Sequence, residues 1–259
     1  MKEKYSMFKY HFEFDKTKKS QKLKKFLKNY KNYSAKKCNV IVVAGGDGFM
    51  IKIIKKYYKN RKPFYGINCG TIGFLMNKYH ILYLDKKIDR AKTFSINPLE
   101  IEIQSLKGKK SKILAINEIS LLRQGKQTAI LKLKVNNNTL IKKLIGDGIL
   151  VSTPAGSTAY NLSVHGPILS LNSKKLAITP ISPFRPRRWK GKVLSDRSSI
   201  FIQNLDSDKR PVAAVADNFE IRHIKNIKIK SNKKISFKLL FNASESLIKK
   251  IKLEQRKLS

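Results

Sequence analysis

The first ninety residues alternate short apolar runs with amphipathic segments, and this alternation restricts the possible folds more than any other feature of the chain. Residues 7–14, 40–44 and 63–67 have the composition of strands, and the continuous apolar run at 40–44 is typical of a strand buried on both faces of a parallel sheet. Residues 18–32 and 50–57 carry apolar side chains at helical spacing. This order predicts an α/β domain with a doubly wound, Rossmann-like parallel sheet.

From about residue 94 onward, short β-type runs follow one another with turns rather than helices between most of them. The runs are ILAINEISLL, AILKLKV, TLIKKLI, GILVS, LAIT, SIFIQNL and PVAAV. They predict a second, β-rich domain. Near the end of the chain, a strand-like ISFKLLF precedes a segment with helical periodicity. We therefore expect an α/β domain at 1–93, a β-rich domain at 94–230, and a C-terminal segment at 231–259 whose helix packs back on the first domain.

The formal net charge of +39 attracts nucleic acid or anionic membrane, so a basic nucleic-acid-binding protein is one alternative. The excess is mostly Lys and is spread along the chain, with no arginine-rich arm and no zinc-finger spacing. Asn and Ile are also abundant, and a genome biased toward A/T codons gives the same composition. We expect nucleic-acid binding to be incidental only.

Two further features indicate the compartment. No stretch approaches the ~18 to 20 apolar residues of a membrane helix, and the N-terminus lacks the continuous apolar run of a secretory signal. Cys38 and Cys69 lack the paired spacing of a zinc site. We expect a cytoplasmic protein with reduced thiols and no membrane partner.

Glycine is concentrated in two windows of the sequence. Of the 13 glycines, ten lie at positions 45, 46, 48, 66, 70, 73, 146, 148, 156 and 166. Glycine lets another group approach the backbone closely, so these windows are the candidate binding site.

The GGDG motif at 45–48 follows the buried strand and precedes a helix. The free N–H groups at a helix start suit a phosphate, so we expect Gly45, Gly46 and Gly48 to bind phosphate. Asp47 would repel phosphate, but it is well placed to accept a proton from an attacking hydroxyl or to hold Mg²⁺ between phosphates. The alternative is that Asp47 only caps the following helix. No side chain is assigned as a direct metal ligand.

Three more motifs carry polar or aromatic groups. Residues 66–77, GINCGTIGFLMN, place Phe74 where it could close over a ring. Asn117 and Glu118 are an adjacent amide and carboxylate at the end of a strand, a pair able to hydrogen-bond vicinal hydroxyls such as those of a ribose. The third motif, at 146–169, is rich in glycine and hydroxyl residues and opens a helix near Tyr160.

With these motifs in this order, the sequence resembles the NAD kinase family over nearly its whole length. The motifs are GGDG, G-x-N-x-G-x-x-G-F-L, NE and GDG-x-x-V-S-T-P-x-G-S-T-A-Y-N-x-S, of which the last is the most specific; ITPISPFRPRRW and PVAAVAD also look like the versions of one bacterial branch. The resemblance implies transfer of the terminal phosphoryl group of ATP, or of polyphosphate, to the 2′-hydroxyl of the adenosine ribose of NAD, with Mg²⁺ as cofactor.

By the same resemblance, Asp47 is the base that takes the proton of that hydroxyl. The residues implied to bind NAD are Asp47, Gly48, Phe74, Asn117, Glu118, Asp147, Ala155, Thr158, Ala159, Tyr160, Asn161, Leu162, Ser163, Asp217 and Asn218. Two of these depart from the family pattern: Ala155 stands where many relatives have Thr, and Asn218 where others have Gly or His. A homodimer or homotetramer is also implied.

The nearest alternative is a lipid or sphingoid kinase of the same GGDG superfamily. Such kinases lack the NE pair and the TPAGSTAYN motif, so both features favour the NAD kinase interpretation. The sequence leaves open the choice between ATP and polyphosphate.

Overall fold

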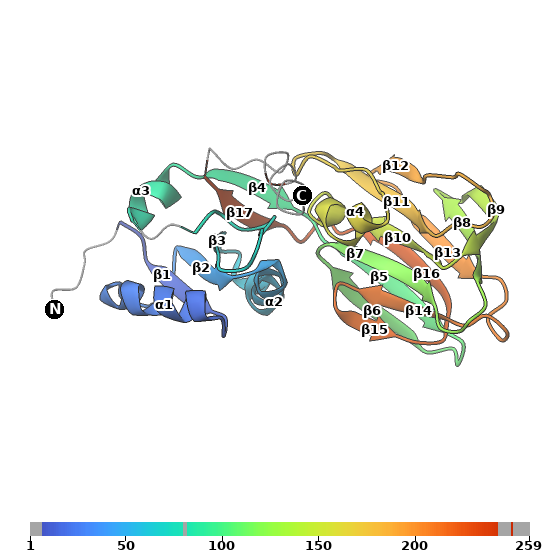
Figure 1. Cartoon of the computed structure of the whole chain (residues 1–259), viewed down its shortest axis with the longest axis horizontal. Coiled ribbons are helices and arrows are strands. Elements are labelled where there is room, and N and C mark those ends of the chain that lie inside the picture. Colours follow the sequence, from blue (N-terminus) through green and yellow to red (C-terminus); the bar gives the residue numbers. More distant parts are fainter. Residues whose placement is uncertain (1–6, 80–81, 243–249, 251–259) are drawn as a thin grey trace. The chain divides into compact units, whose positions relative to one another are not determined.

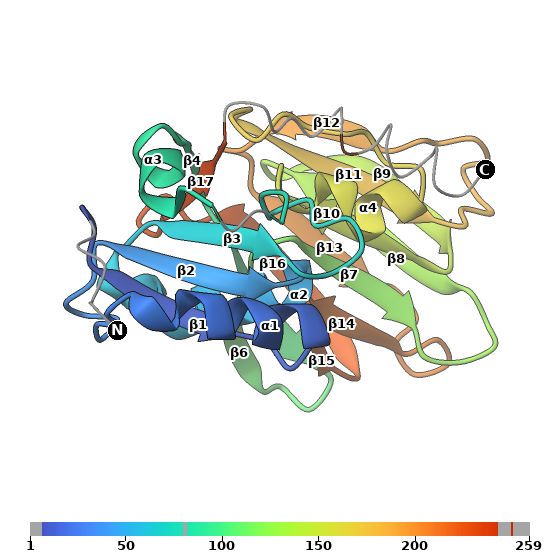
Figure 2. The same cartoon turned by 60° about the vertical axis from the view of Figure 1, so that its left-hand side comes forward.

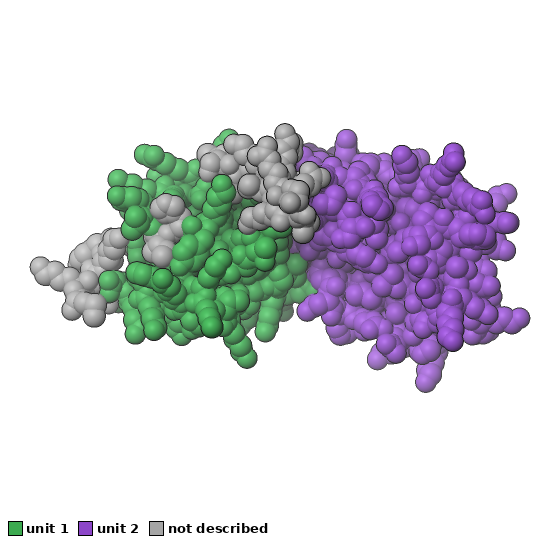
Figure 3. Space-filling view, viewed as in Figure 1, with its two compact units in different colours: residues 1–96, 236–259 green, residues 97–235 purple. Residues whose placement is uncertain are grey.

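The computed structural model describes residues 7–79, 82–242 and 250, and it divides into two compact units. The first unit comprises residues 1–96 and 236–259, and the second comprises residues 97–235 (Figure 3). The expected C-terminal helix at 244–255 lies outside the described residues, apart from Lys250. No helix among the described residues is long and apolar enough to cross a membrane.

The first unit is built on a five-stranded sheet in the order β1-β2-β3-β17-β4 (Figure 1). Strands β1, β2, β3 and β17 run parallel, and β4 pairs antiparallel with β17 at the edge. The predicted parallel α/β sheet is therefore confirmed. Its elements are β1 (Tyr10–Phe14), α1 (Lys18–Phe26), β2 (Val40–Gly45), α2 (Asp47–Tyr57), β3 (Phe64–Asn68), α3 (Leu84–Asp89), β4 (Lys92–Ile96) and β17 (Phe237–Phe241), with 3₁₀ turns at Leu27–Asn29 and Tyr58–Asn60.

Helices cover both faces of this sheet. Val42 of β2 shares a buried cluster with Leu23 of α1, which lies in front of β1 in Figure 2. Gly66 of β3 pairs in register with Val43, and Met50 of α2 fills the space beside Gly66. Neighbouring residues of a strand point to opposite faces, so α1 and α2 pack on opposite sides of β2 and β3.

Helix α1 is shorter than the periodicity of residues 18–32 indicates. Its start is fixed by Thr17, whose side chain accepts a hydrogen bond from the Ser20 backbone N–H. The helix ends at Phe26 and tightens into a 3₁₀ turn. Beyond it, the Asn32 side chain accepts a hydrogen bond from the Phe12 N–H of β1 at 3.0 Å, and this contact holds the chain extended along the edge of the sheet.

The second unit consists of two six-stranded antiparallel sheets, as its β-rich sequence predicts. One has the order β12-β11-β10-β7-β14-β15 and the other β6-β5-β16-β13-β8-β9. Their strands are β5 (Leu99–Ser105), β6 (Lys110–Ala115), β7 (Glu118–Arg123), β8 (Ala129–Val135), β9 (Asn138–Gly146), β10 (Gly148–Ser152), β11 (Lys175–Ile181), β12 (Lys192–Ser195), β13 (Ile200–Asn204), β14 (Val212–Ala216), β15 (Phe219–Ile221) and β16 (Ile224–Ser231).

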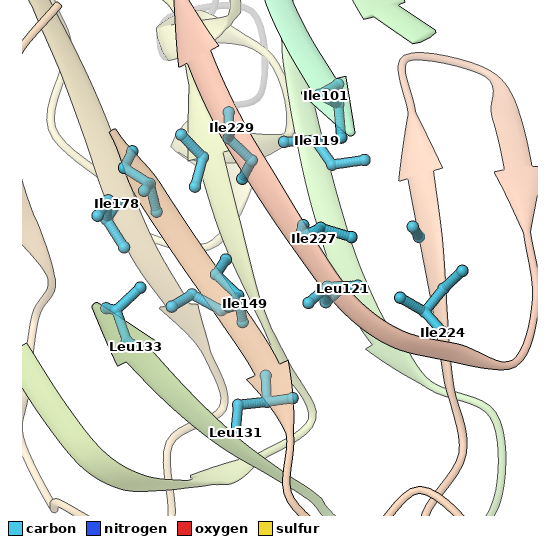
Figure 4. Close-up of a cluster of buried hydrophobic side chains, with 14 of the residues drawn as sticks. Ile101, Ile119, Leu121, Leu131, Leu133, Ile149, Ile178, Ile224, Ile227 and Ile229 are labelled. Atoms are coloured by element: carbon cyan, nitrogen blue, oxygen red, sulfur yellow. The ribbon is translucent and has the colours of Figure 1, made fainter. Parts of the chain in front are cut away.

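A single large cluster of buried aliphatic side chains joins the two sheets of this unit (Figure 4). Ile119, Ile149 and Ile178 come from one sheet, and Leu133 and Ile227 from the other. Burial of each such side chain stabilises the fold by about 1.5–3 kcal/mol relative to its exposure. This core keeps the loops at the ends of β7, β10 and β14 in fixed positions.

Strand β16 was not among the predicted strands, because its lysines conceal its pattern. Ile224, Ile227 and Ile229 are buried in the core, whereas Lys225, Lys228 and Lys230 are exposed. From Ile227 to Lys230 the burial alternates with a period of two, as in a half-buried strand, whereas a β-bulge between Ile224 and Asn226 breaks the alternation before it. In a chain this rich in lysine, the sequence of β16 resembles a solvated charged segment instead.

Candidate active site

The GGDG motif lies in the first unit, at the junction between β2 and α2. Strand β2 ends at Gly45, Gly46 is the N-cap residue, and α2 begins at Asp47. The first backbone N–H groups of a helix have no partner within the helix and carry partial positive charge. A Cβ atom placed on Gly46 or Gly48 would meet nothing within 4 Å among the described residues. The packing of the protein therefore leaves the backbone open to an incoming anion at these two positions.

Asp47 does not cap its helix. Instead its carboxylate accepts hydrogen bonds from two backbone N–H groups of a distant turn, Phe74 to Oδ2 at 2.7 Å and Leu75 to Oδ1 at 2.8 Å. Among the residues that the structure describes, each oxygen accepts one of these bonds and keeps a lone pair for a further donor. Burial raises the pKa of Asp47, although the bonds from Leu75 and Phe74 and the charge of Lys250 lower it. A raised pKa makes the carboxylate a stronger proton acceptor.

The turn that holds Asp47 depends on glycine at position 73. Gly73 has φ +70°, a conformation that L-residues rarely adopt, and its Cα packs against the Asn68 side chain, which a Cβ would approach to 2.6 Å. Asn68 in turn donates to the Ile72 carbonyl at 2.7 Å. Phe74 is partly exposed, so its ring remains available to a ligand.

In the second unit, Asn117 and Glu118 lie at the start of β7 rather than at the end of a strand. The run ILAINEISLL is divided between β6 and β7, because the Asp217 carboxylate accepts the N–H groups of Ile116 and Asn117 at 2.9 and 2.8 Å. Asn117 is 9% exposed and Glu118 is 8% exposed. Among the described residues, neither Oδ1 of Asn117 nor Oε2 of Glu118 has a hydrogen-bond partner. Buried polar atoms are normally paired, so this pair is ready to bind a polar ligand.

Burial, aided by the negative charge of Asp217, raises the pKa of Glu118 from 4.5 to about 8. Burial also raises the pKa of Tyr160, with smaller contributions from Asp147 and Glu118. Tyr160 therefore lies within electrostatic reach of both acids. The structure brings together Glu118, Asp147, Tyr160 and Asp217, which are far apart in the sequence.

The raised pKa of Glu118 predicts a pH-dependent stability. Between its ordinary pKa of 4.5 and about 8, the folded protein holds a proton that the unfolded chain has released, so this group's stabilisation is present below 4.5 and is lost as the pH rises through 8. From about pH 5 to about pH 8.5, the thermal midpoint should fall more steeply in the wild type than in Glu118→Gln. Glu102→Gln, at an exposed site in β5, is the matched control. Parallel wild-type and Glu118→Gln curves would contradict the shift.

The motif at 146–169 forms a compact turn, a 3₁₀ helix at Gly156–Thr158 and the short helix α4 (Tyr160–Ser163). Gly156 packs so closely on Asn117 that a Cβ would lie 2.3 Å from the Asn117 carbonyl oxygen. Asn161 is fully buried, and both its amide hydrogens and its oxygen have protein partners: Ser157, Pro167 and Thr179. The Asn161 side chain therefore holds the turn together, and its backbone carbonyl also accepts the Gly166 N–H. Ala155 and Thr158 are also buried, Ala159 and Leu162 are partly exposed, and Ser163 is exposed.

Two site residues at strand ends differ in their surroundings. Asp147, between β9 and β10, forms an ion pair with Arg123 at 2.5 Å. Asp217 is held at φ 51° between β14 and β15, where it orients Asn117, while the neighbouring Asn218 is exposed. Sequence reasoning missed Arg123 and Lys250, since nothing distinguishes them among 56 Lys and Arg residues. Within the described residues, no group of three or more His, Cys, Asp or Glu side chains could hold a metal ion.

A parallel α/β sheet with an acid at an open glycine turn, and a β-rich unit that presents unpaired hydrogen-bonding groups among the described residues, favour a nucleotide-binding phosphotransferase. Models of the ATP-NAD kinase N-terminal and C-terminal domains match residues 1–86 and 116–237. The NAD kinase of Zymomonas mobilis is 44% identical over 245 residues, which cover 93% of this chain and 95% of the relative. The chain belongs to the NAD kinase family, and it is an enzyme of the kinase class.

Two solved structures share the fold. One is an NAD kinase from Archaeoglobus fulgidus in complex with ATP, with a TM-score of 0.72, 21% identity, and coverage of 94% of this chain and 98% of that one. The other is yeast NADH kinase complexed with NADH, with a TM-score of 0.72, 22% identity, and coverage of 86% and 68%. The family match favours the NAD kinase interpretation over a lipid kinase or a nucleic-acid-binding protein.

Proposed function

We propose that the chain transfers the terminal phosphoryl group of ATP to the 2′-hydroxyl of the adenosine ribose of NAD, with Asp47 as the base. The observation that carries the proposal is the Asp47 carboxylate, which lies beside open glycine backbone at a helix start and is aligned by the Phe74 and Leu75 N–H groups. The same carboxylate makes no cap bond, which argues against a purely helix-capping role.

In this mechanism the 2′-hydroxyl gives its proton to Asp47 as its oxygen bonds to the terminal phosphorus of ATP. The bond from that phosphorus to the bridging oxygen breaks, and ADP leaves with the electron pair. The products are NADP and ADP, and Asp47 later releases the proton to solvent. A positioned base contributes about 10²- to 10⁴-fold to the rate, and the remainder comes from orientation and charge neutralisation.

We propose that ATP binds with Mg²⁺ already on its phosphates, so that the metal arrives as part of the substrate. Mg²⁺ is commonly held by substrate phosphates and waters with one or two carboxylates, and Asp47 is the carboxylate at the open glycine turn. The backbone at Gly45, Gly46 and Gly48 would bind phosphate oxygens at the positive end of α2.

The groups proposed to bind NAD are the following. Asn117 and Glu118 present unpaired oxygens that suit the vicinal hydroxyls of a ribose. When the pH is below the Glu118 pKa of about 8, the Glu118 carboxyl is neutral, so it can donate a hydrogen bond to one hydroxyl and accept one from another. The remaining proposed contacts are Asp47, Gly48, Phe74, Asp147, Ala155, Thr158, Ala159, Tyr160, Asn161, Leu162, Ser163, Asp217 and Asn218.

The assembly and compartment are also proposals. The family resemblance supports a homodimer or homotetramer, which sedimentation would test. Cys38 and Cys69 are both buried, free thiols, which fits a reducing, cytoplasmic location.

The direct test is formation of NADP from NAD and Mg²⁺-ATP, read with an NADP-specific dehydrogenase. We expect turnover with ATP that is abolished by EDTA and restored by excess Mg²⁺, because unneutralised phosphates resist attack. Inorganic polyphosphate is supplied in a parallel reaction. Folded protein inactive with both donors would contradict the proposal, and activity with polyphosphate alone would replace ATP as the donor.

A further inference from the structure

Lys250 is a buried lysine of the first unit whose ammonium group lies against the turn that holds Asp47. Its side chain comes from the C-terminal part of the chain and is 6% exposed. The Nζ atom donates to the carbonyl oxygens of Gly73 at 3.1 Å and of Phe74 at 3.3 Å, and also to that of Met76. Burying a lysine is unfavourable unless its charge has hydrogen-bonding partners, and the three carbonyl groups supply those partners.

The two sides of the turn bind opposite charges. The peptide group between Gly73 and Phe74 receives Lys250 on its carbonyl and gives its N–H to Asp47. The next peptide group, between Phe74 and Leu75, does the same. Two successive peptide dipoles therefore connect the ammonium group to the carboxylate. Hydrogen bonds in such a chain polarise and strengthen one another.

We propose that Lys250 is a positioning residue for phosphoryl transfer, because it fixes the 73–76 turn so that the Phe74 and Leu75 N–H groups orient the Asp47 carboxylate. The inference rests on the proposed role of Asp47 as the base. Lys250 acts through the turn and is not assigned any contact with substrate. The Phe241 ring, 5.0 Å from Nζ, supports the ammonium from β17.

The proposal predicts a change in turnover rather than in binding. Lys250→Met should lower kcat by about 10- to 100-fold and leave the KM for NAD within a few-fold, because a misplaced reacting group slows chemistry. The acidic limb of the pH profile should move to higher pH, since the ammonium charge lowers the pKa of Asp47. Lys250→Arg, which keeps the charge, should recover part of the rate.

Lys238→Met is the matched control, because Lys238 is an exposed lysine of the same unit and its loss changes the net charge equally. It should behave as the wild type. A folded Lys250→Met with wild-type kcat and an unmoved pH profile would overturn the proposal. If Lys250→Met does not fold, Lys250→Gln takes its place, because it removes the charge while keeping a hydrogen-bond donor. A folded Lys250→Gln with wild-type kcat and an unmoved pH profile would likewise overturn the proposal.

A second measurement does not depend on activity. Hydrogen exchange at the Phe74 and Leu75 amides should accelerate in Lys250→Met and stay unchanged in Lys238→Met, and equal exchange in wild type and Lys250→Met would overturn the positioning role. Asp47→Asn is assayed in parallel. An active Asp47→Asn shows that the proposed base is wrong, whereas an inactive Asp47→Asn beside a fully active Lys250→Met shows that only the Lys250 inference fails.

Discussion

Replacing Asp47 by Asn should reduce kcat for NADP formation by roughly 10²- to 10⁴-fold, because an amide cannot take the hydroxyl proton. NAD affinity should stay within a few-fold of the wild type. The side chains are nearly isosteric, and Asn keeps an oxygen that can accept one of the two N–H bonds from Phe74 and Leu75. Steady-state kinetics and calorimetric titration with NAD measure the two quantities separately.

The matched control is Asp89→Asn, the same chemical change at an exposed position of the first unit. It should leave kcat unchanged. Thermal unfolding must show that Asp47→Asn is folded, since the carboxylate also anchors the turn at 73–76. Undiminished turnover in folded Asp47→Asn would remove Asp47 from the role of base.

Loss of the Asn117 or Glu118 side chain should weaken NAD binding by about tenfold or more. Each Ala variant removes a buried hydrogen-bonding group, and an unmade hydrogen bond of this kind costs about 1–3 kcal/mol. Glu118→Gln should retain more affinity at neutral pH than Glu118→Ala, because the carboxyl is already neutral below its pKa of about 8. Calorimetry with NAD in the absence of ATP measures the affinities directly.

Glu102→Ala, an exposed glutamate of the same unit, is the control for these variants. Its affinity for NAD should match the wild type. If Asn117→Ala and Glu118→Ala bind NAD as tightly as Glu102→Ala does, the unpaired oxygens at the start of β7 serve some other ligand.

Part of the architecture could be predicted from the period that burial imposes on the sequence, although the alternating β5, LEIEIQS, was not among the predicted strands. Two strands could be recognised from their sequences alone: the fully buried β2, VIVVAG, and the alternating β8, AILKLKV. Strand β16 could not, because a β-bulge between Ile224 and Asn226 interrupts its alternation within a lysine-rich stretch. The extended segment after α1 is held by a contact from Asn32 to Phe12 that spans 20 residues. Long-range contacts of that kind leave no local pattern.

The same limit applies to the candidate site. Glycine clustering and family motifs pointed to Asp47, Asn117 and Glu118. The partners that set their properties were hidden: Asp217 lies 100 residues from the Asn117 N–H that it accepts, and Lys250 lies more than 170 residues from the carbonyls it binds. Burial, which raises the pKa of Glu118, is likewise a property of the folded chain alone.

The place of β17 in the first sheet has a consequence for synthesis. This strand lies between β3 and β4 but is encoded after the whole second unit. The second unit is continuous in sequence, so it can fold on the ribosome before β17 has been synthesised. At that stage β3 and β4 lack the strand that lies between them in the finished sheet. A nascent chain that stops before residue 237 leaves two strand edges unpaired, and such edges invite aggregation. Completion of the first sheet thus depends on synthesis of the whole second unit and of β17 after it.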